Sequence, residues 1–127
     1  MQKVVPEAPM KTALFYSNEI TDLEDIINAW LEEKRVTIED VVFSPSSPGE
    51  NEGEKFALLF FSDSLTTCAT RVKIFDSGTI TPIKLVKEID AWLQTSNAKE
   101  VRTKQFVTPA INLNIRVRIY IFVLYTS

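Results

Sequence analysis

Histidine is absent from this chain of 127 residues, and cysteine and glycine are scarce. Without histidine the chain lacks the commonest general base, every Ser-His or Cys-His nucleophile and any zinc site that uses imidazole. The single cysteine, Cys68, excludes an intramolecular disulfide and fits a reducing cytoplasm. Glycine occurs only at positions 49, 53 and 78, so there is no Gly-rich phosphate loop, and no Asp-rich calcium loop is present. We therefore expect no enzymatic activity, no metal and no cofactor.

Long apolar runs are also missing. No stretch approaches the roughly 20 residues that a membrane span needs, and Arg116 and Arg118 interrupt the apolar C-terminal segment. The N-terminus does not have the basic-then-apolar pattern of a signal peptide. An apolar content of 45% with 24% charged residues is typical of a globular protein. We expect a cytoplasmic protein of one compact domain with no membrane partner.

Charge is divided unevenly along the chain. Residues 1–64 carry five Lys or Arg against thirteen Asp or Glu, whereas residues 65–127 carry nine against four. The first half is therefore acidic and the second basic, although the net charge of the chain is only −3. Halves of opposite sign either serve different purposes or pair head to tail.

One helical pattern occurs twice, at an offset of 62 residues. Asn28-Ala29-Trp30-Leu31 matches Asp90-Ala91-Trp92-Leu93, and the apolar positions Leu23 and Ile27 match Leu85 and Ile89. The flanking segments agree more loosely, since Leu14-Phe15-Tyr16-Ser17 precedes the first helix as Ile74-Phe75-Asp76-Ser77 precedes the second. This repetition predicts one structural unit used twice.

Hydrophobic periodicity predicts the same order of elements, strand-helix-strand-strand, in each copy. We expect a flexible tail over residues 1–10, a first copy over 11–64 and a second over 65–127. The expected helices cover 20–31 and 80–93, and the expected strands cover 11–16, 36–43, 55–62, 71–75, 99–107 and 114–125. The fold class predicted is α+β, a duplicated β-α-β-β unit forming a two-layer α/β sandwich with pseudo-twofold symmetry.

Three smaller features carry structural predictions. The nearly continuous apolar strand Lys55 to Ser62 predicts burial on both of its faces. Trp30 and Trp92 lie on the apolar stripes of the helices and are expected in the core, whereas Cys68 is interpreted as a plain small residue. The acidic segment Ser44 to Glu54 is either a flexible hairpin loop or a lid over a ligand.

The second copy resembles a known family. It runs from Arg71-Val72-Lys73-Ile74-Phe75-Asp76 through a helix ending in Glu88-Ile89-Asp90-Ala91-Trp92-Leu93 to a Lys/Arg-bearing strand and an apolar final strand. This order resembles the short Cse-type sporulation proteins of spore-forming bacteria and their phages, which are about one copy long. In the first copy only the helix matches, and Ser77-Gly78-Thr79 stand where that family usually has acidic residues. The resemblance implies a small non-enzymatic protein and carries over no binding residues.

Six cations in the second copy form the main candidate site. They lie in pairs two residues apart, so each pair points to one side of its strand, and all six could line the sheet face opposite the helix. Tyr120 and Phe122 would add stacking surface beside them. The six are Arg71, Lys73, Arg102, Lys104, Arg116 and Arg118. Alternatives are a solvated sheet face, salt bridges to the acidic half of a partner chain and, least favoured because the acidic half repels polyanions, nucleic acid.

The turn Ser77-Gly78-Thr79 before the second helix is a further candidate. Hydroxyl groups and backbone N–H groups at the start of a helix can hold an anion, and Ser77 and Thr79 would then bind the ligand. Alternatively, these residues only cap the helix.

The leading hypothesis is a non-enzymatic protein that sequesters a small phosphate-bearing, nucleotide-type signalling molecule. By analogy with the sponge proteins that phages use against signalling defences such as Thoeris or CBASS, it would serve phage counter-defence. The alternative is a protein–protein interaction module, a sporulation-type regulator or phage inhibitor of a host protein, whose basic sheet face docks on an acidic protein surface. In either case we expect a homo-oligomer, because the apolar strand edges need covering.

Overall fold

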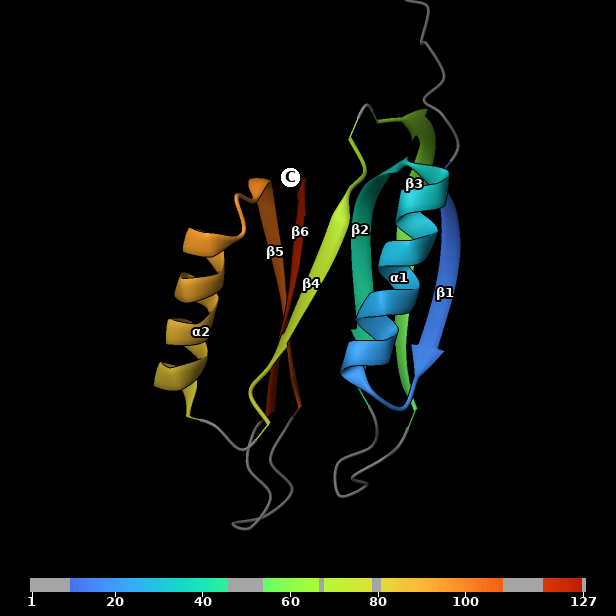
Figure 1. Cartoon of the computed structure of the whole chain (residues 1–127). Helices are drawn as coiled ribbons and strands as arrows, with labels where there is room; N and C mark the ends of the chain where they lie inside the picture. Colours follow the sequence, from blue (N-terminus) through green and yellow to red (C-terminus); the bar gives the residue numbers. More distant parts are fainter. Residues whose placement is uncertain (1–9, 46–53, 67, 79–80, 109–117, 127) are drawn as a thin grey trace, which may run out of the picture.

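The computed structural model describes residues 10–45, 54–66, 68–78, 81–108 and 118–126. Two units follow one another with the same order of elements, as the periodicity predicts (Figure 1). The first comprises β1 (Lys11–Ser17), α1 (Ile20–Lys34), β2 (Val36–Ser44) and β3 (Lys55–Leu65). The second comprises β4 (Arg71–Asp76), α2 (Pro82–Thr95), β5 (Lys99–Thr108) and β6 (Arg118–Thr126). The predicted α+β class is confirmed.

Each unit forms its own three-stranded sheet, with the last strand of the unit in the middle. The strand orders are β1-β3-β2 in the first sheet and β4-β6-β5 in the second, and every neighbouring pair is antiparallel. β1 and β2 therefore run parallel to each other with β3 between them. This agrees with the prediction that the helix crossover leaves its two strands parallel and that the third strand returns antiparallel.

A β-bulge aligns the buried side chains of β2. Ile38 pairs with Phe61 and Val41 with Leu59, and the register shifts by one residue between Ile38 and Asp40. Because the extra residue restores the alternation, Ile38 and Val41 both face the core although they are three positions apart. The first sheet thus presents one continuous apolar face.

α1 packs on this apolar face of the first sheet. Leu23, Ile27 and Leu31 are fully buried there. The Trp30 ring meets Phe15 and Phe61 edge-on, with centroid distances of 5.4 and 5.1 Å. The expectation that Trp30 is a core contact is confirmed.

α2 packs on one face of the second sheet in a comparable way. The Trp92 ring meets Phe75 and Tyr125 edge-on at 5.8 and 4.8 Å, so Trp92 is also a core contact. Leu85, however, is the one buried residue among those that the structure describes in α2, whereas α1 buries three. α2 is therefore packed on one side only, and in Figure 1 it lies on the flank of the second sheet away from the first sheet.

The two units meet through different faces. Phe43, on the helix-covered face of the first sheet, contacts the rings of Phe106, Tyr120 and Phe122 at 5.7, 4.8 and 5.0 Å. These three side chains lie on the helix-free face of the second sheet. A twofold axis would bring the same face from both units, so the contact does not have the predicted pseudo-twofold form. The second sheet instead lies between the first sheet and α2, and the layers number more than the predicted two.

α1 also closes the free edge of β4. The Asn28 amide donates to the backbone oxygen of Val72 at 2.9 Å and accepts from its N–H at 2.7 Å. The Glu24 carboxylate accepts from the N–H of Ile74 at 2.6 Å. These side chains replace the hydrogen bonds that a neighbouring strand would supply, so the edge is not open to further pairing.

The expectation that the Lys55 to Ser62 strand is covered on both faces is wrong. Leu59 and Phe61 are buried on the α1 side, but Phe56 on the other side is 37% exposed. The apolar composition reflects the central position of β3, and no described helix or strand lies over its second face. We call this helix-free side of the first sheet, from β1, β2 and β3, the open face.

Several predictions fall on residues outside the described ranges. These are the tail over residues 1–9, the central part of the acidic segment at 46–53, and the candidate ligand residues Thr79 and Arg116. Neither described helix is long and apolar enough to cross a membrane.

Candidate functional site

The five described cations of the predicted basic face lie on two opposite sides of the second sheet. Lys73 pairs with Val123 on the α2 side, whereas Lys104 pairs with Phe122 on the helix-free side. Alternation along each strand places Arg71 with Lys73, and Arg102 and Arg118 with Lys104. The prediction of one basic face is therefore wrong. Spacing within a strand shows which cations share a side, but only the register between strands shows which sides coincide.

Two cations of β5 join the second sheet to the first. The Arg102 guanidinium donates to the backbone oxygen of Ile38 at 2.7 Å, and the Lys104 ammonium lies 3.0 Å from the Asp40 carboxylate. The hydrogen bond from Lys104, followed by that from the Val41 N–H, lowers the pKa of Asp40. Arg102 and Lys104 thus both connect the two halves of the chain. The Lys104–Asp40 ion pair resembles the predicted salt bridge to the acidic half of a partner, but it forms within one chain.

The two cations of β4 differ from each other. Lys73 lies 3.8 Å from the Glu24 carboxylate of α1 and 5.6 Å from the centre of the Phe75 ring. Arg71, at the start of the strand, is exposed. Lys73 therefore also belongs to the contact between the halves, and Arg71 points into solvent.

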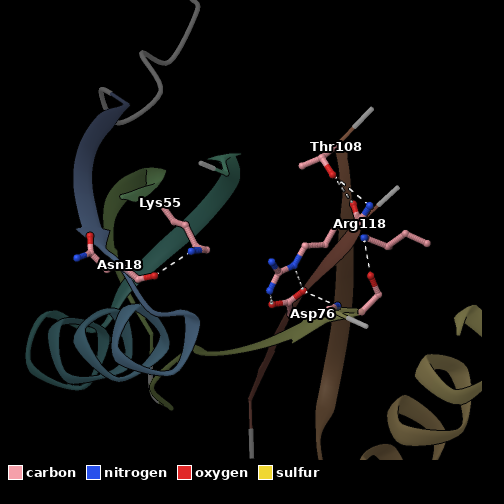
Figure 2. Close-up of polar contacts among 8 residues, drawn as sticks. Asn18, Lys55, Asp76, Thr108 and Arg118 are labelled. Atoms are coloured by element: carbon pink, nitrogen blue, oxygen red, sulfur yellow. Dashed lines mark hydrogen bonds and ion pairs between the residues drawn. The ribbon is translucent and has the colours of Figure 1, made fainter. Parts of the chain in front are cut away.

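Arg118 forms a two-pronged ion pair at the end of the second sheet. Its Nε and Nη2 atoms donate to the two carboxylate oxygens of Asp76 at 2.7 and 2.5 Å (Figure 2). The hydrogen bond to Asp76 raises the pKa of Arg118. The guanidinium lies 5.4 Å from the Tyr120 ring centre, and burial raises the pKa of the Tyr120 phenol. This arrangement fixes the orientation of the guanidinium.

Ser77 extends the sheet instead of presenting its hydroxyl group to a ligand. The hydroxyl accepts from the Ile119 N–H at 2.8 Å, and the Ser77 N–H donates to the Ile119 oxygen at 2.8 Å. Gly78 follows in the left-handed region at φ 51°, where glycine is favoured, and its N–H donates to Asp76. The residue that caps α2 is Thr81, which accepts from the Lys84 N–H at 3.3 Å.

A pocket of about 410 Å³ lies beside Arg118 at the start of α1. We call it the α1 pocket. Figure 2 shows Lys55 and Asn18 on one side and the Arg118–Asp76 pair on the other. The Lys55 ammonium donates to the Asn18 backbone oxygen at 2.8 Å. The residues lining the pocket are Asn18, Glu19, Ile20, Thr21, Lys55, Asp76 and Arg118.

The N-terminus of α1 lies at this pocket. Glu19 is the N-cap residue, and its side chain makes no capping hydrogen bond. The first N–H groups of a helix have no partner inside the helix, and they carry the positive end of the helix dipole. Ile20 and Thr21 bring this end of α1 to the pocket wall.

A larger groove of about 760 Å³ lies at the opposite end of the strands. Among its charged lining residues, Arg102 is outnumbered by Glu39 and Glu100, and Arg102 already donates to Ile38. Cys68 also lines this groove and is exposed. Its charge makes the groove the weaker candidate for an anionic ligand.

Sequence reasoning predicted Arg118 as a ligand-binding residue, but it did not predict that Lys55 and Asp76 also line the pocket. Lys55 is 4% exposed and is the first residue of the apolar strand β3. A lysine at the start of an apolar strand is only a weak indication of a buried cation. Asp76 directly follows the apolar run of β4, where a carboxylate can reach the end of a neighbouring strand. Within the described part of the chain, no group of three Asp, Glu or Cys side chains is placed to hold a metal ion.

No protein-family model, curated protein or solved structure matches this chain.

Proposed function

We propose that this is a non-enzymatic binding protein that sequesters a small phosphate-bearing molecule of the nucleotide type in the α1 pocket. The observation that carries the proposal is the convergence of Lys55, Arg118 and the N-terminus of α1 on one pocket. Charged N–H donors and a helix N-terminus are the groups that proteins use to hold phosphate.

The charge of the pocket supports an anion of modest size. Lys55 and Arg118 are formally balanced by Glu19 and Asp76, and the helix end adds roughly half a positive charge. Asp76 takes two of the five N–H donors of Arg118 and holds the guanidinium in place, so the remaining donors can face a ligand. We expect recognition of one phosphate group and not of an extended polyanion.

The volume of the pocket fits the same class of ligand. Pockets for small molecules have volumes of roughly 300–1,000 Å³, and the α1 pocket measures about 410 Å³. Of the ligand residues proposed from the sequence, Arg118 lines the pocket and Tyr120 lies against Arg118. As a non-enzymatic binding protein, it would act by lowering the free concentration of its ligand, as a phage counter-defence sponge would.

Isothermal titration calorimetry tests this function. Cyclic di- and trinucleotides, isomers of cyclic ADP-ribose, inorganic phosphate and, as controls, unphosphorylated nucleosides are each titrated into the purified protein. We expect saturable heat with at least one nucleotide and none with unphosphorylated nucleosides. Baseline heats for the whole panel would overturn the proposal.

Thr21→Asp separates ligand binding from folding. A carboxylate in the first turn of α1 favours the helix dipole, so the fold is retained, while its charge repels an anion from the pocket. We expect the dissociation constant to rise by about tenfold or more, which corresponds to about 1.4 kcal/mol. Ala91→Asp, exposed on α2, makes the same change in net charge and should leave binding unchanged.

A protein–protein interaction module is the second candidate. It is favoured by the open face of the first sheet, where Leu14 and Tyr16 are more than half exposed. Patches of this kind on a folded chain mark interaction sites. The basic sheet face proposed from the sequence does not support this function, because Arg102, Lys104 and Lys73 already contact the first half of the same chain.

A further inference from the structure

Two apolar surfaces at opposite ends of the molecule have no cover from the described elements. The first is the open face, where Leu14, Tyr16, Val42 and Phe56 are 57%, 58%, 45% and 37% exposed. The strand register places all four side chains on one side of the sheet. Such a continuous apolar patch from three adjacent strands is unusual for a surface that faces only water.

The second surface is one flank of α2. Ile83, Val86 and Leu93 are 71%, 55% and 40% exposed. Steps of three and seven residues bring these side chains to the same side of the helix, next to the stripe that packs on the second sheet. We call this surface the α2 flank. In Figure 1, α2 lies at one side of the molecule and the first sheet, which carries the open face, at the other.

The contact between the two halves of the chain uses the counterparts of these surfaces. At the 62-residue offset, the exposed Val86 and Leu93 correspond to Glu24 and Leu31 of α1. Glu24 bonds the edge of β4, and Leu31 is fully buried. Through Glu24, this side of α1 is thus covered by β4 of the second unit, while Leu31 packs on the first sheet. Among the described residues no third unit covers the α2 flank.

The open face has a counterpart in the second sheet. The aligned flanks pair the exposed Leu14 with Ile74, which is 5% exposed and lies in the core between the halves. The helix-free face of the second sheet is therefore buried by the first unit. The equivalent face of the first sheet is left open because no unit precedes it among the described residues.

We propose that copies of this protein associate head to tail, with the α2 flank of one copy packed on the open face of the next. The contact would repeat between chains the kind of packing that joins the two units within a chain. The net charges of the two halves favour the same pairing at long range, since the half that carries α2 is basic and the half that carries the open face is acidic. Within α2 itself the charges balance, with two lysines, Lys84 and Lys87, against Glu88 and Asp90. A contact between two open faces would instead bring two acidic halves together.

The proposed contact pairs unlike surfaces, so it is heterologous. Such a contact continues into an open chain of copies, or closes into a ring when the rotation between copies permits. Where α1 has Glu24, α2 has Val86, which makes this part of the flank more apolar. Asp90 stands in place of Asn28 and can accept hydrogen bonds from a strand edge but cannot donate to it. The inter-chain contact therefore relies on apolar burial. It does not depend on a ligand in the α1 pocket.

Light scattering after size exclusion tests the proposal on the full chain without ligand, over a concentration series. We expect the wild-type mass to rise with concentration above that of the 14.4 kDa monomer. Leu14→Asp and Val86→Asp each disrupt one of the two surfaces, and each variant alone should remain monomeric. Ala91→Asp, about 140° around α2 from Val86, should associate like wild type.

Mixing the two variants decides the geometry. Leu14→Asp keeps an intact α2 flank and Val86→Asp keeps an intact open face, so an equimolar mixture should form a dimer and nothing larger. If one variant still self-associates and mixing restores nothing, the contact joins like surfaces and the proposal is overturned. A wild-type chain that stays monomeric throughout also overturns it.

Circular dichroism shows whether each variant is folded. If Leu14→Asp does not fold, Tyr16→Asp is used in its place to alter the open face. If Val86→Asp does not fold, Ile83→Asp is used to alter the α2 flank. Calorimetry on wild type reports the α1 pocket separately, so loss of self-association and loss of ligand binding are distinguishable outcomes.

Discussion

The charged side chains of this protein act mainly through their partners within the chain. Arg102 and Lys104 reach the backbone and carboxylate of β2, Lys73 lies near Glu24, and Arg118 is held by Asp76. Pairs that are half exposed contribute little to stability because water competes for both partners. Their main effect is to set the position of one half relative to the other, and to present Arg118 to the α1 pocket.

Asp40 gives a pH-dependent test of one of these pairs. Its pKa is lowered in the folded state, so the unfolded chain takes up the proton at a higher pH. The resulting stability is present above about pH 4 and is lost as the pH falls through the folded-state pKa. Asp40→Asn should therefore lower the free energy of unfolding at pH 6, by less than about 1 kcal/mol, and have a smaller effect near pH 3.

Urea titrations at the two pH values measure this difference. The control is the same substitution in a Lys104→Met background, where the largest cause of the lowered pKa is missing. If Asp40→Asn changes the free energy of unfolding equally at both pH values, folding does not stabilise the charged form of the Asp40 carboxylate.

At the scale of the elements, the two helices differ in what surrounds them. α1 is enclosed by the first sheet on one side and by the edge of β4 on the other, whereas α2, among the described elements, packs on the second sheet alone. The polar pair Glu24 and Asn28 is suited to a strand edge, because a carboxylate and an amide can replace the missing backbone partners.

Asn28→Leu tests the closure of that edge. It removes both hydrogen bonds to the Val72 backbone and leaves a half-buried N–H and C=O without them. We expect a loss of about 1–3 kcal/mol in the free energy of unfolding, typical of an unsatisfied buried group. The Val72 amide should also exchange its hydrogen faster.

Hydrogen exchange followed by NMR reports the Val72 amide directly. Glu33→Leu, an exposed position on the opposite side of α1, serves as control and should leave this amide protected. Unchanged protection in Asn28→Leu would mean that the side-chain bonds do not hold the edge.

At the scale of the whole molecule, stability depends on the aromatic contact between the sheets. Phe43 is 4% exposed and lies against three rings of the second unit. The same residue type occurs at Phe56 on the open face, where it is 37% exposed and its ring meets that of Tyr16. Substituting each phenylalanine therefore compares a side chain buried between the two halves with one that is partly exposed on the outer surface.

Phe43→Ala should lower the free energy of unfolding by about 3–5 kcal/mol, as expected for a large-to-small change in a core. Phe56→Ala should cost clearly less, because its side chain is already partly in water. Chemical denaturation followed by circular dichroism measures both. Equal losses in the two variants would contradict the assignment of Phe43 to the contact between the halves.

The amino-acid sequence by itself determined the order of the elements and the two helix stripes. Alternation in strands and the i, i+3, i+4 pattern in helices are local, so they can be recognised from neighbouring residues alone. The lack of histidine and of glycine-rich loops likewise excludes classes of chemistry without reference to the fold. The duplication indicated by the matching helices stays a prediction, supported by the shared strand order.

Only the tertiary structure decided which cations share a side, which residues line the α1 pocket and which apolar surfaces remain open. These relations join residues such as Glu24 and Ile74, which lie 50 positions apart, and Arg102 and Ile38, which lie 64 apart. Strand register and the choice of packed face follow from how the whole chain fills its core. No local pattern encodes that choice, because each strand alternates in the same way whichever face is buried.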